Sequence, residues 1–141
     1  MKLTQLITLN AILTIAFGIA FGIYGPLMMA IFNVPETPGG TADFYWLIVS
    51  FARMYGASLF GFGILLWAVK GVVAQATTSA ESRRGIIFGL LLANAMGAFV
   101  ALVQQSAFWL SGAGWVTVGV YLLLMAGYIY FLVKQNAGIS N

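Results

Sequence analysis

The chain has 141 residues, of which 62% are hydrophobic and 6% are charged, and its formal net charge is +3. A water-soluble domain carries about 25% charged residues to cover its solvated surface. This composition therefore excludes an ordinary soluble fold and predicts an integral membrane protein surrounded by membrane lipid. Six scattered cations do not form the basic face of a nucleic-acid binder, so we expect no nucleic-acid partner.

The residue types that usually carry catalysis are scarce. The chain has no cysteine and no histidine, which excludes thiol chemistry and removes the most common proton shuttle, metal ligand and haem ligand. Its three acids, Glu36, Asp43 and Glu81, lie in or beside predicted loops. We therefore expect no catalytic residue, no metal site and no cofactor, and we predict that the protein is not an enzyme.

The first apolar run extends over residues 6–32 and predicts the first transmembrane helix. Pro26 interrupts this run, because proline lacks the N–H group that would bond a carbonyl one turn earlier. Two structures satisfy this constraint. Either the helix kinks at Pro26, or it ends near Tyr24 and a short interfacial helix follows at residues 26–32.

A loop at residues 33–43 separates the first span from the second, which covers residues 44–69. Two prolines and two adjacent glycines in this loop break any helical periodicity. Tyr45 and Trp46 begin the second span and Trp67 ends it, as expected for the aromatic belts at membrane interfaces.

The rest of the chain continues the alternation of loops and spans. It comprises a polar loop at residues 70–84, a third span at 85–108, a tight hairpin at 109–114 and a fourth span at 115–133. Ser79 or Ser82 is expected to cap the amino end of the third helix, because serine accepts hydrogen bonds from the free N–H groups there.

Small residues at helical spacing are typical of closely packed transmembrane helices. In the second span Ser50, Ala57 and Gly61 lie on one side, and Gly63 adds a second small site. Two further patterns lie in the first and third spans. Gly18 and Gly22 form one such step in the first span. In the third span the same spacing covers five positions: Gly85, Gly89, Ala93, Gly97 and Ala101. A ligand groove and a dimer face are alternatives for the third-span pattern, but we favour tight packing inside the bundle for both patterns.

The loop cations predict the orientation in the membrane. They lie in the head, the middle loop and the tail, at Lys2, Lys70, Arg83, Arg84 and Lys134. An even number of spans places these three segments on one side, and the positive-inside rule makes that side the cytoplasm. The predicted fold is an all-α, integral membrane four-helix bundle, a single domain over residues 1–141, with both termini in the cytoplasm.

Arg53 is the one charge well inside a span, roughly 13 Å from the outer end of its helix. A cation at that depth is costly and usually marks either a function or a buried partner. One interpretation is an anion or headgroup site. The other, which we favour because no span contains an acid, is a tether between helices. Its candidate partners are Tyr24, Gln104, Gln105, the carbonyl of Gly22 and, if the outer loop folds inward, Asp43 or Glu36. The long side chain can also extend outward toward the headgroups.

Three amides of the third span, Asn94, Gln104 and Gln105, form a second candidate site. Asn94 and Gln105 are about three helical turns apart and share a face. They either line a polar ligand pocket or join helices through hydrogen bonds worth about 0.6–2 kcal/mol each. We favour the second interpretation.

Three segments carry a resemblance to a known family: YGP after the first helix, FARMYGASLFGFGILLW in the second and RRG before the third. Together they resemble the small four-span bacterial membrane proteins of DUF4345, a domain of unknown function, and more loosely DoxX-like proteins. The resemblance implies a multi-pass protein of the bacterial inner membrane, without a known activity, in which Arg53 matches a recurring arginine. Asn94, Gly97 and Gln105 stand where the family would have a second arginine.

Three functional hypotheses remain open. The favoured one is a non-enzymatic accessory or scaffold subunit of a larger membrane complex, or a self-associating bundle, since small-residue faces are abundant. The alternative is a binder of a lipid or quinone near Arg53, which predicts a pocket in the outer half. The third is a small four-span transporter. It ranks last because such transporters need a glutamate in the first span, and residues 6–32 contain no acid.

Overall fold

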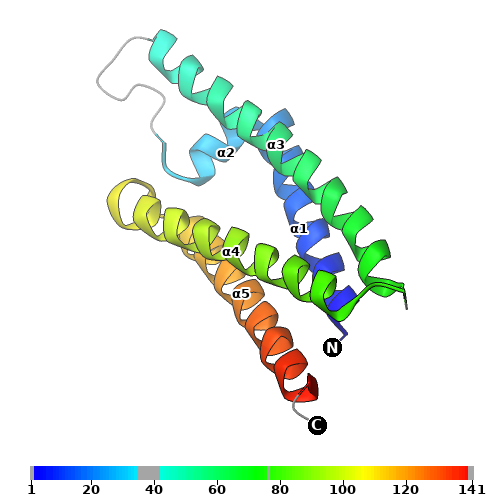
Figure 1. Ribbon diagram of the computed structural model, residues 1–141. Coiled ribbons are helices and arrows are strands. Elements are labelled where there is room, and N and C mark those ends of the chain that lie inside the picture. The colour runs from blue at the N-terminus through cyan, green and yellow to red at the C-terminus, as the bar shows by residue number, and fades with distance from the viewer. Residues whose placement is uncertain (1, 35–41, 76, 140–141) are drawn as a thin grey trace.

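The computed structural model describes residues 2–34, 42–75 and 77–139, and its elements are helices (Figure 1). They are α1 (Leu3–Ile23), α2 (Gly25–Ile31), α3 (Ala42–Ala74), α4 (Ala80–Gln104), the π-helical segment η1 (Gln105–Trp109) and α5 (Gly112–Ile139). In the described part of the chain, four helices are long and apolar enough to cross a membrane: α1, α3, α4 continued by η1, and α5. The prediction of an all-α helical bundle is confirmed.

The four long helices form two pairs. α1 packs along α3 and α4 packs along α5, whereas the contacts between the pairs are few. Figure 1 shows that the pairs converge at the end that holds the N-terminus and spread apart at the other end. We call these the packed end and the open end. The loop cations predict that the open end faces outward, away from the cytoplasm.

The packed end is an apolar core to which all four long helices contribute. Its buried residues include Leu6 and Ile7 of α1, Leu66 and Val73 of α3, Ile87 and Leu90 of α4, and Leu124 and Tyr128 of α5. The buried residues of the cluster at the open end come from α1, from α2 with its C-cap residue Phe32, and from α3: Phe21, Met28, Met29, Phe32, Tyr45 and Val49. From the other pair, Trp109 and Ala113 pack against this cluster and are only partly buried. The two pairs are therefore held together mainly at one end.

Glycines bring the backbones of α1 and α3 into contact. A Cβ placed on Gly18 would lie 2.5 Å from the backbone nitrogen of Phe60, and one on Gly56 would collide with the backbone of Gly22. The prediction of close helix approach is confirmed at Gly18, whereas a Cβ on Gly22 would meet no described atom within 4 Å, so only the backbone of Gly22 takes part in the contact. Their partner glycine, Gly56, was not anticipated.

The small-residue pattern of α4 has a different outcome. A Cβ on Gly97 would lie 2.5 Å from the ring of Tyr121, so this glycine is tightly packed. One on Gly85 or Gly89 would meet no described atom within 4 Å. The expectation of tight packing is therefore wrong for the first half of the pattern. The buried face of α4 instead follows Ile87, Leu90, Asn94, Ala98 and Ala101.

The first helix ends rather than kinks. α1 stops at Ile23, and Pro26 is the second residue of the separate helix α2. The N–H of Tyr24 donates to the carbonyl of Ala20 at 2.9 Å, and the N–H of Met28 donates to the carbonyl of Tyr24 at 3.0 Å. Proline suits this position because its missing N–H would be unbonded in a first helical turn.

The polar loop between α3 and α4 is shorter than expected. α3 continues to Ala74, because Val73 packs into the core of the packed end. Lys70 therefore lies within the helix, and its ammonium group is 4.5 Å from the centre of the Trp67 ring, a cation–π contact. Ser79 is the helix cap, since its hydroxyl accepts a hydrogen bond from the N–H of Ser82 at 3.1 Å.

The tight turn between α4 and α5 begins with a π-helical segment, η1, that the sequence pattern did not predict. After η1 the chain reverses at Leu110, whose φ of 46° is left-handed. Ser111 then accepts a hydrogen bond from the N–H of Gly114 at 3.1 Å and starts α5. Such π segments occur frequently at functional sites, and η1 borders the site described next.

Candidate functional site

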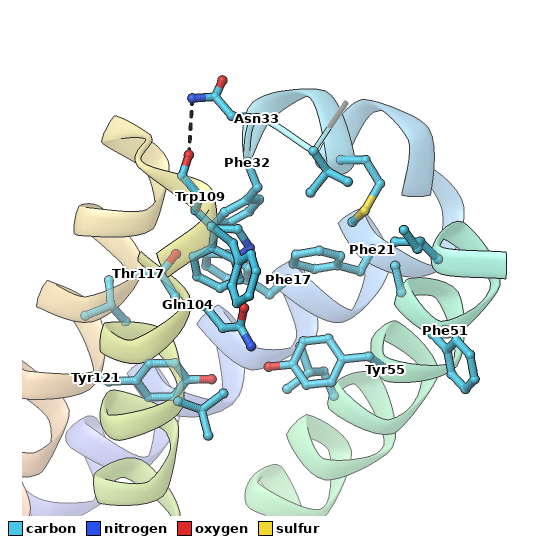
Figure 2. Close-up of a pocket in the computed structure, with 18 of the residues that line it drawn as sticks. Phe17, Phe21, Phe32, Asn33, Phe51, Tyr55, Gln104, Trp109, Thr117 and Tyr121 are labelled. Carbon is cyan, nitrogen blue, oxygen red and sulfur yellow. Dashed lines mark hydrogen bonds between the residues drawn. The ribbon is translucent and has the colours of Figure 1, made fainter. Parts of the chain in front are cut away.

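A large cavity separates the two helix pairs at the open end (Figure 2). Its volume is about 790 Å³. Residues from every helix contribute to its lining: Leu13, Thr14, Phe17, Phe21, Met29, Phe32, Asn33, Val34, Phe44, Ile48, Phe51, Ala52, Tyr55, Leu59, Val100, Gln104, Phe108, Trp109, Thr117, Val120, Tyr121 and Leu124. A smaller cavity of about 230 Å³ adjoins it and shares Tyr55, Trp109 and Tyr121.

The cavity is closed at the open end by a contact between α2 and η1. The rings of Phe32 and Trp109 lie 4.5 Å apart between centres. Beside them the side-chain amide of Asn33 donates a hydrogen bond to the carbonyl of Trp109 at 3.2 Å, drawn as the dashed line in Figure 2. This bond satisfies one of the carbonyls that lack a partner at a helix end.

The mouth of the cavity lies between α3 and α4. Its lining residues on α1 and α5 are buried or half-buried, as they would be in a back wall. Those on α3 and on α4 with η1 are more exposed, for example Phe51 at 63%, Val100 at 49% and Phe108 at 71%. In a membrane, this opening faces the lipid sideways.

Aromatic rings form a continuous wall. Phe17 stacks on Phe21 at 6.4 Å, and Phe21 stacks on Phe32 at 5.7 Å, which brings the row to Trp109. Tyr55 meets Phe21 edge-on at 5.7 Å. Chain segments far apart in the sequence thus present flat apolar faces to one space.

Three polar side chains converge inside this apolar space. Figure 2 shows the hydroxyls of Tyr55 and Tyr121 pointing toward each other from opposite helix pairs, with the amide of Gln104 directed between them. The hydroxyls of the two lining threonines are instead already hydrogen-bonded to the backbone. Thr14 and Thr117 each donate to a carbonyl of their own helix, at 2.7 and 3.0 Å. Tyr55, Gln104 and Tyr121 are therefore the polar side chains that converge at one point of the cavity, and we call them the polar trio.

The amides singled out from the sequence take three different positions. Gln104 belongs to the polar trio. Gln105 is 1% exposed and lies against Gly114, and its Oε1 has no hydrogen-bond partner among the described residues. Asn94 is buried and donates to the carbonyl of Leu90 in its own helix at 2.7 Å.

Arg53 and Tyr24 lie away from the cavity, and both are exposed. The side chain of Arg53 covers Gly25 at the start of α2, since a Cβ there would be 3.4 Å from Arg53 Cγ. Within the described residues, nothing forms a hydrogen bond or ion pair with its guanidinium group. The loop that carries Glu36 lies outside those residues. A ligand or tether role for Arg53, Tyr24 and the third-span amides stays a prediction.

One important polar residue was missed by the sequence analysis. Asn10 of α1 is buried at the packed end, where its amide donates to the hydroxyl of Tyr128 in α5 at 3.0 Å. Its Oδ1 accepts from Thr14 at 3.2 Å. A signal existed, because Asn10 is the one amide inside the first predicted span. The side chains of the cavity carried no such signal, since rings along a span look like lipid-facing residues.

No protein-family model matches the chain, and no curated protein or solved structure matches it. The resemblance to the DUF4345 and DoxX-like proteins therefore stays a prediction. The features of the cavity that bear on function are its size, its aromatic wall, the polar trio and the absence of charge among its described lining residues.

Proposed function

We propose that this protein is a non-enzymatic membrane protein that binds a neutral lipophilic molecule between its two helix pairs. The observation that carries the proposal is the cavity of about 790 Å³ at the open end. Small-molecule sites are concave, mostly apolar volumes of roughly 300–1,000 Å³ with a few convergent polar groups. The cavity and its polar trio have this composition.

The size of the cavity supports occupancy by a molecule. An empty apolar volume costs about 24 cal/mol per Å³, so a void of this size would cost roughly 20 kcal/mol. That exceeds the whole unfolding free energy of a typical protein, about 5–15 kcal/mol. That cost applies to a sealed void, whereas this cavity opens toward lipid, so in a membrane it is filled by apolar material, either acyl chains that enter through the mouth or a bound lipophile, rather than left empty.

The lining supports a neutral occupant. None of the described residues around the cavity is charged. A charged ligand would lose its hydration without gaining an ion pair, which is very unfavourable in an apolar environment. The alternative suggested by the sequence, a lipid or a quinone, is thus favoured here over the scaffold hypothesis, although the position of the cavity differs from a site beside Arg53.

A scaffold or self-associating role remains the second candidate. The feature that supports it is the exposed small-residue surface at Gly85 and Gly89, where a Cβ would meet no described atom within 4 Å. Such a surface permits another helix to approach closely. Transport stays last, because the described lining of the cavity contains no acid that could couple it to protons.

The test compares what copurifies with the protein before and after the cavity is filled. The protein is released from its native membrane in a mild detergent, and bound molecules are measured by native mass spectrometry and organic extraction. We expect about one lipophile per chain in the parent. Ala52→Trp and Thr117→Trp, which fill the cavity from α3 and α5, should remove most of it. The same spectra report any stoichiometric partner protein or second copy.

Ala57→Trp is the matched control. Ala57 lies on α3 outside the cavity lining and is exposed, so the added ring would meet detergent or lipid. This variant should retain the lipophile. The proposal is wrong if the parent releases no lipophile, or if both filled variants retain as much as Ala57→Trp.

A further inference from the structure

Two members of the polar trio, Tyr55 and Tyr121, lie deep in the membrane-spanning region, and the amide of Gln104, whose backbone is about 8 Å from the end of its span at Trp109, points toward them. Tyr55 is about 18 Å along α3 from Asp43, where the spanning segment begins, and Tyr121 is about 14 Å along α5 from Gly112. A phospholipid in the bilayer keeps its charged headgroup at the surface. Its acyl chains would enter the cavity, but its polar atoms would not reach the trio.

Acyl chains would leave the trio only partly satisfied, because the hydroxyls of Tyr55 and Tyr121 can bond each other but the remaining donors would have no acceptor from the ligand. Two tyrosine hydroxyls and one carboxamide together offer four N–H or O–H donors. A buried donor without an acceptor costs about 1–3 kcal/mol. Because donors are abundant at this point, the group that suits it best is an uncharged acceptor, and a carbonyl oxygen is a common neutral group that accepts hydrogen bonds without donating one.

The walls favour a ring over a chain. Nine of the 22 described lining residues are aromatic, and each stacked or edge-on aromatic pair is worth about 0.5–1.5 kcal/mol beyond the area that it buries. The row from Phe17 through Phe21 and Phe32 to Trp109 is a set of flat faces fixed against one another. A flexible chain gains nothing from that order, whereas a planar ring does.

The mouth between α3 and α4 indicates the direction from which a ligand enters the cavity. The open end is closed by Phe32, Asn33 and Trp109, and the packed end is filled by its core. The exposed lining residues Phe51 and Phe108 border the remaining side, which faces lipid. A molecule therefore enters sideways from the bilayer, and any long apolar tail stays on that side.

From these observations we infer that the ligand is a neutral planar ring with a carbonyl oxygen at its edge, of the cyclic ketone or quinone type. The ring occupies the inner part of the cavity, where its carbonyl oxygen accepts hydrogen bonds from Tyr55, Gln104 and Tyr121. An apolar tail extends toward lipid between α3 and α4. This inference rests on the proposed function, since it specifies the ligand of the same cavity.

The experiment uses two probes of the same shape. One is 2-methyl-1,4-naphthoquinone, and the other is 2-methylnaphthalene, which lacks the oxygens. Trp109 lines the cavity and serves as the fluorescent reporter after Trp46, Trp67 and Trp115, which are exposed and lie outside the lining, are changed to phenylalanine. The quinone is measured by quenching and the hydrocarbon by competition with it. Since the chain has no cysteine, the quinone forms no thiol adduct.

Removal of the trio should separate the two probes. In Tyr55→Phe/Gln104→Met/Tyr121→Phe we expect the Kd of the quinone to rise about tenfold or more, while that of the hydrocarbon changes less than about twofold. Tyr130→Phe is the control for tyrosine removal, because Tyr130 is exposed on α5 and outside the lining. It should leave both Kd values unchanged.

A second pair of variants moves the trio without deleting it. Gly97→Ala places a methyl group 2.5 Å from the ring of Tyr121 and must displace it, whereas Gly89→Ala on the same helix meets no described atom within 4 Å. We expect the quinone to bind several-fold more weakly to Gly97→Ala and unchanged to Gly89→Ala. The hydrocarbon should discriminate less between them.

The outcomes distinguish a failure of the inference about the ring from a failure of the proposed lipophile binding. If the trio variant weakens both probes equally, or neither, the inference about the ring is wrong while the cavity remains a lipophile site. If neither probe binds the parent and no lipophile copurifies with it, the proposed function is wrong as well. Selective loss of the quinone supports both.

Discussion

The packed end and the open end are built from the same four long helices, yet they use polar residues in opposite ways. At the packed end, Asn10 and Tyr128 bond each other across the two helix pairs inside a filled core. At the open end, Tyr55, Gln104 and Tyr121 converge from both pairs on a space of about 790 Å³. Polar groups that bond each other tie helices together, whereas polar groups that surround a space are suited to a ligand.

The difference also explains why the packed end has to hold the two helix pairs together. Lipid gives little hydrophobic drive for helix association, so close packing and interhelical hydrogen bonds have to supply it. The Gly18–Gly56 contact holds α1 against α3, and the packed end holds that pair against α4 and α5. With these contacts in place, the open end can keep its walls apart.

The largest expected effect breaks the contact within the α1–α3 pair. Gly56→Leu would force a side chain into the backbone of α1 at Gly18 and Gly22, and such overpacking should lower the unfolding free energy by about 3 kcal/mol. Gly61→Leu on the same helix meets no described atom within 4 Å and should change it by less than about 0.5 kcal/mol. Unfolding by SDS in mixed micelles measures both. Equal stability of the two variants would show that α1 and α3 are not in backbone contact.

A smaller effect concerns the hydrogen bond at the packed end. Tyr128→Phe should lower the unfolding free energy by about 1 kcal/mol, because it leaves the buried Asn10 amide without its acceptor. Asn10→Leu/Tyr128→Phe should cost less than the sum of the two single variants, since no polar group is then left alone. The same unfolding assay measures this double-mutant cycle. Tyr130→Phe, at an exposed position of the same helix, should be neutral, and strictly additive effects of the pair would contradict the bond.

The packed end and the open end also differ in what the sequence could predict. Long apolar runs are sufficient to locate the four spans, whereas Pro26 marks an interruption of the first span without telling whether the helix kinks or ends there, which the structure decides. Close approach at Gly18 follows from small-residue spacing, but the same spacing at Gly85 and Gly89 faces no described neighbour. In lipid both faces of a helix are apolar, so the pattern does not tell which one is buried.

The cavity could not be predicted for the same reason. Phe17, Phe32 and Tyr55 lie on different helices, and their convergence depends on the angle between the helix pairs, which no local pattern encodes. The sequence drew attention to Arg53 because of its charge, although Arg53 lies outside the cavity lining. Gln104 alone among the candidate residues lines it.

The smallest expected effect concerns the bond that closes the cavity at the open end. Asn33→Gly keeps the left-handed backbone of this residue, whose φ is 57°, and removes the side chain that donates to Trp109. Because this bond is exposed, the unfolding free energy should fall by less than about 0.5 kcal/mol. The local effect should be clearer: in the variant with Trp109 as its one tryptophan, water-soluble acrylamide should quench the fluorescence more strongly. Leu110→Gly relaxes the neighbouring left-handed residue without touching the bond and should leave quenching unchanged, and equal quenching in the two variants would mean that Asn33 does not shield the cavity from water.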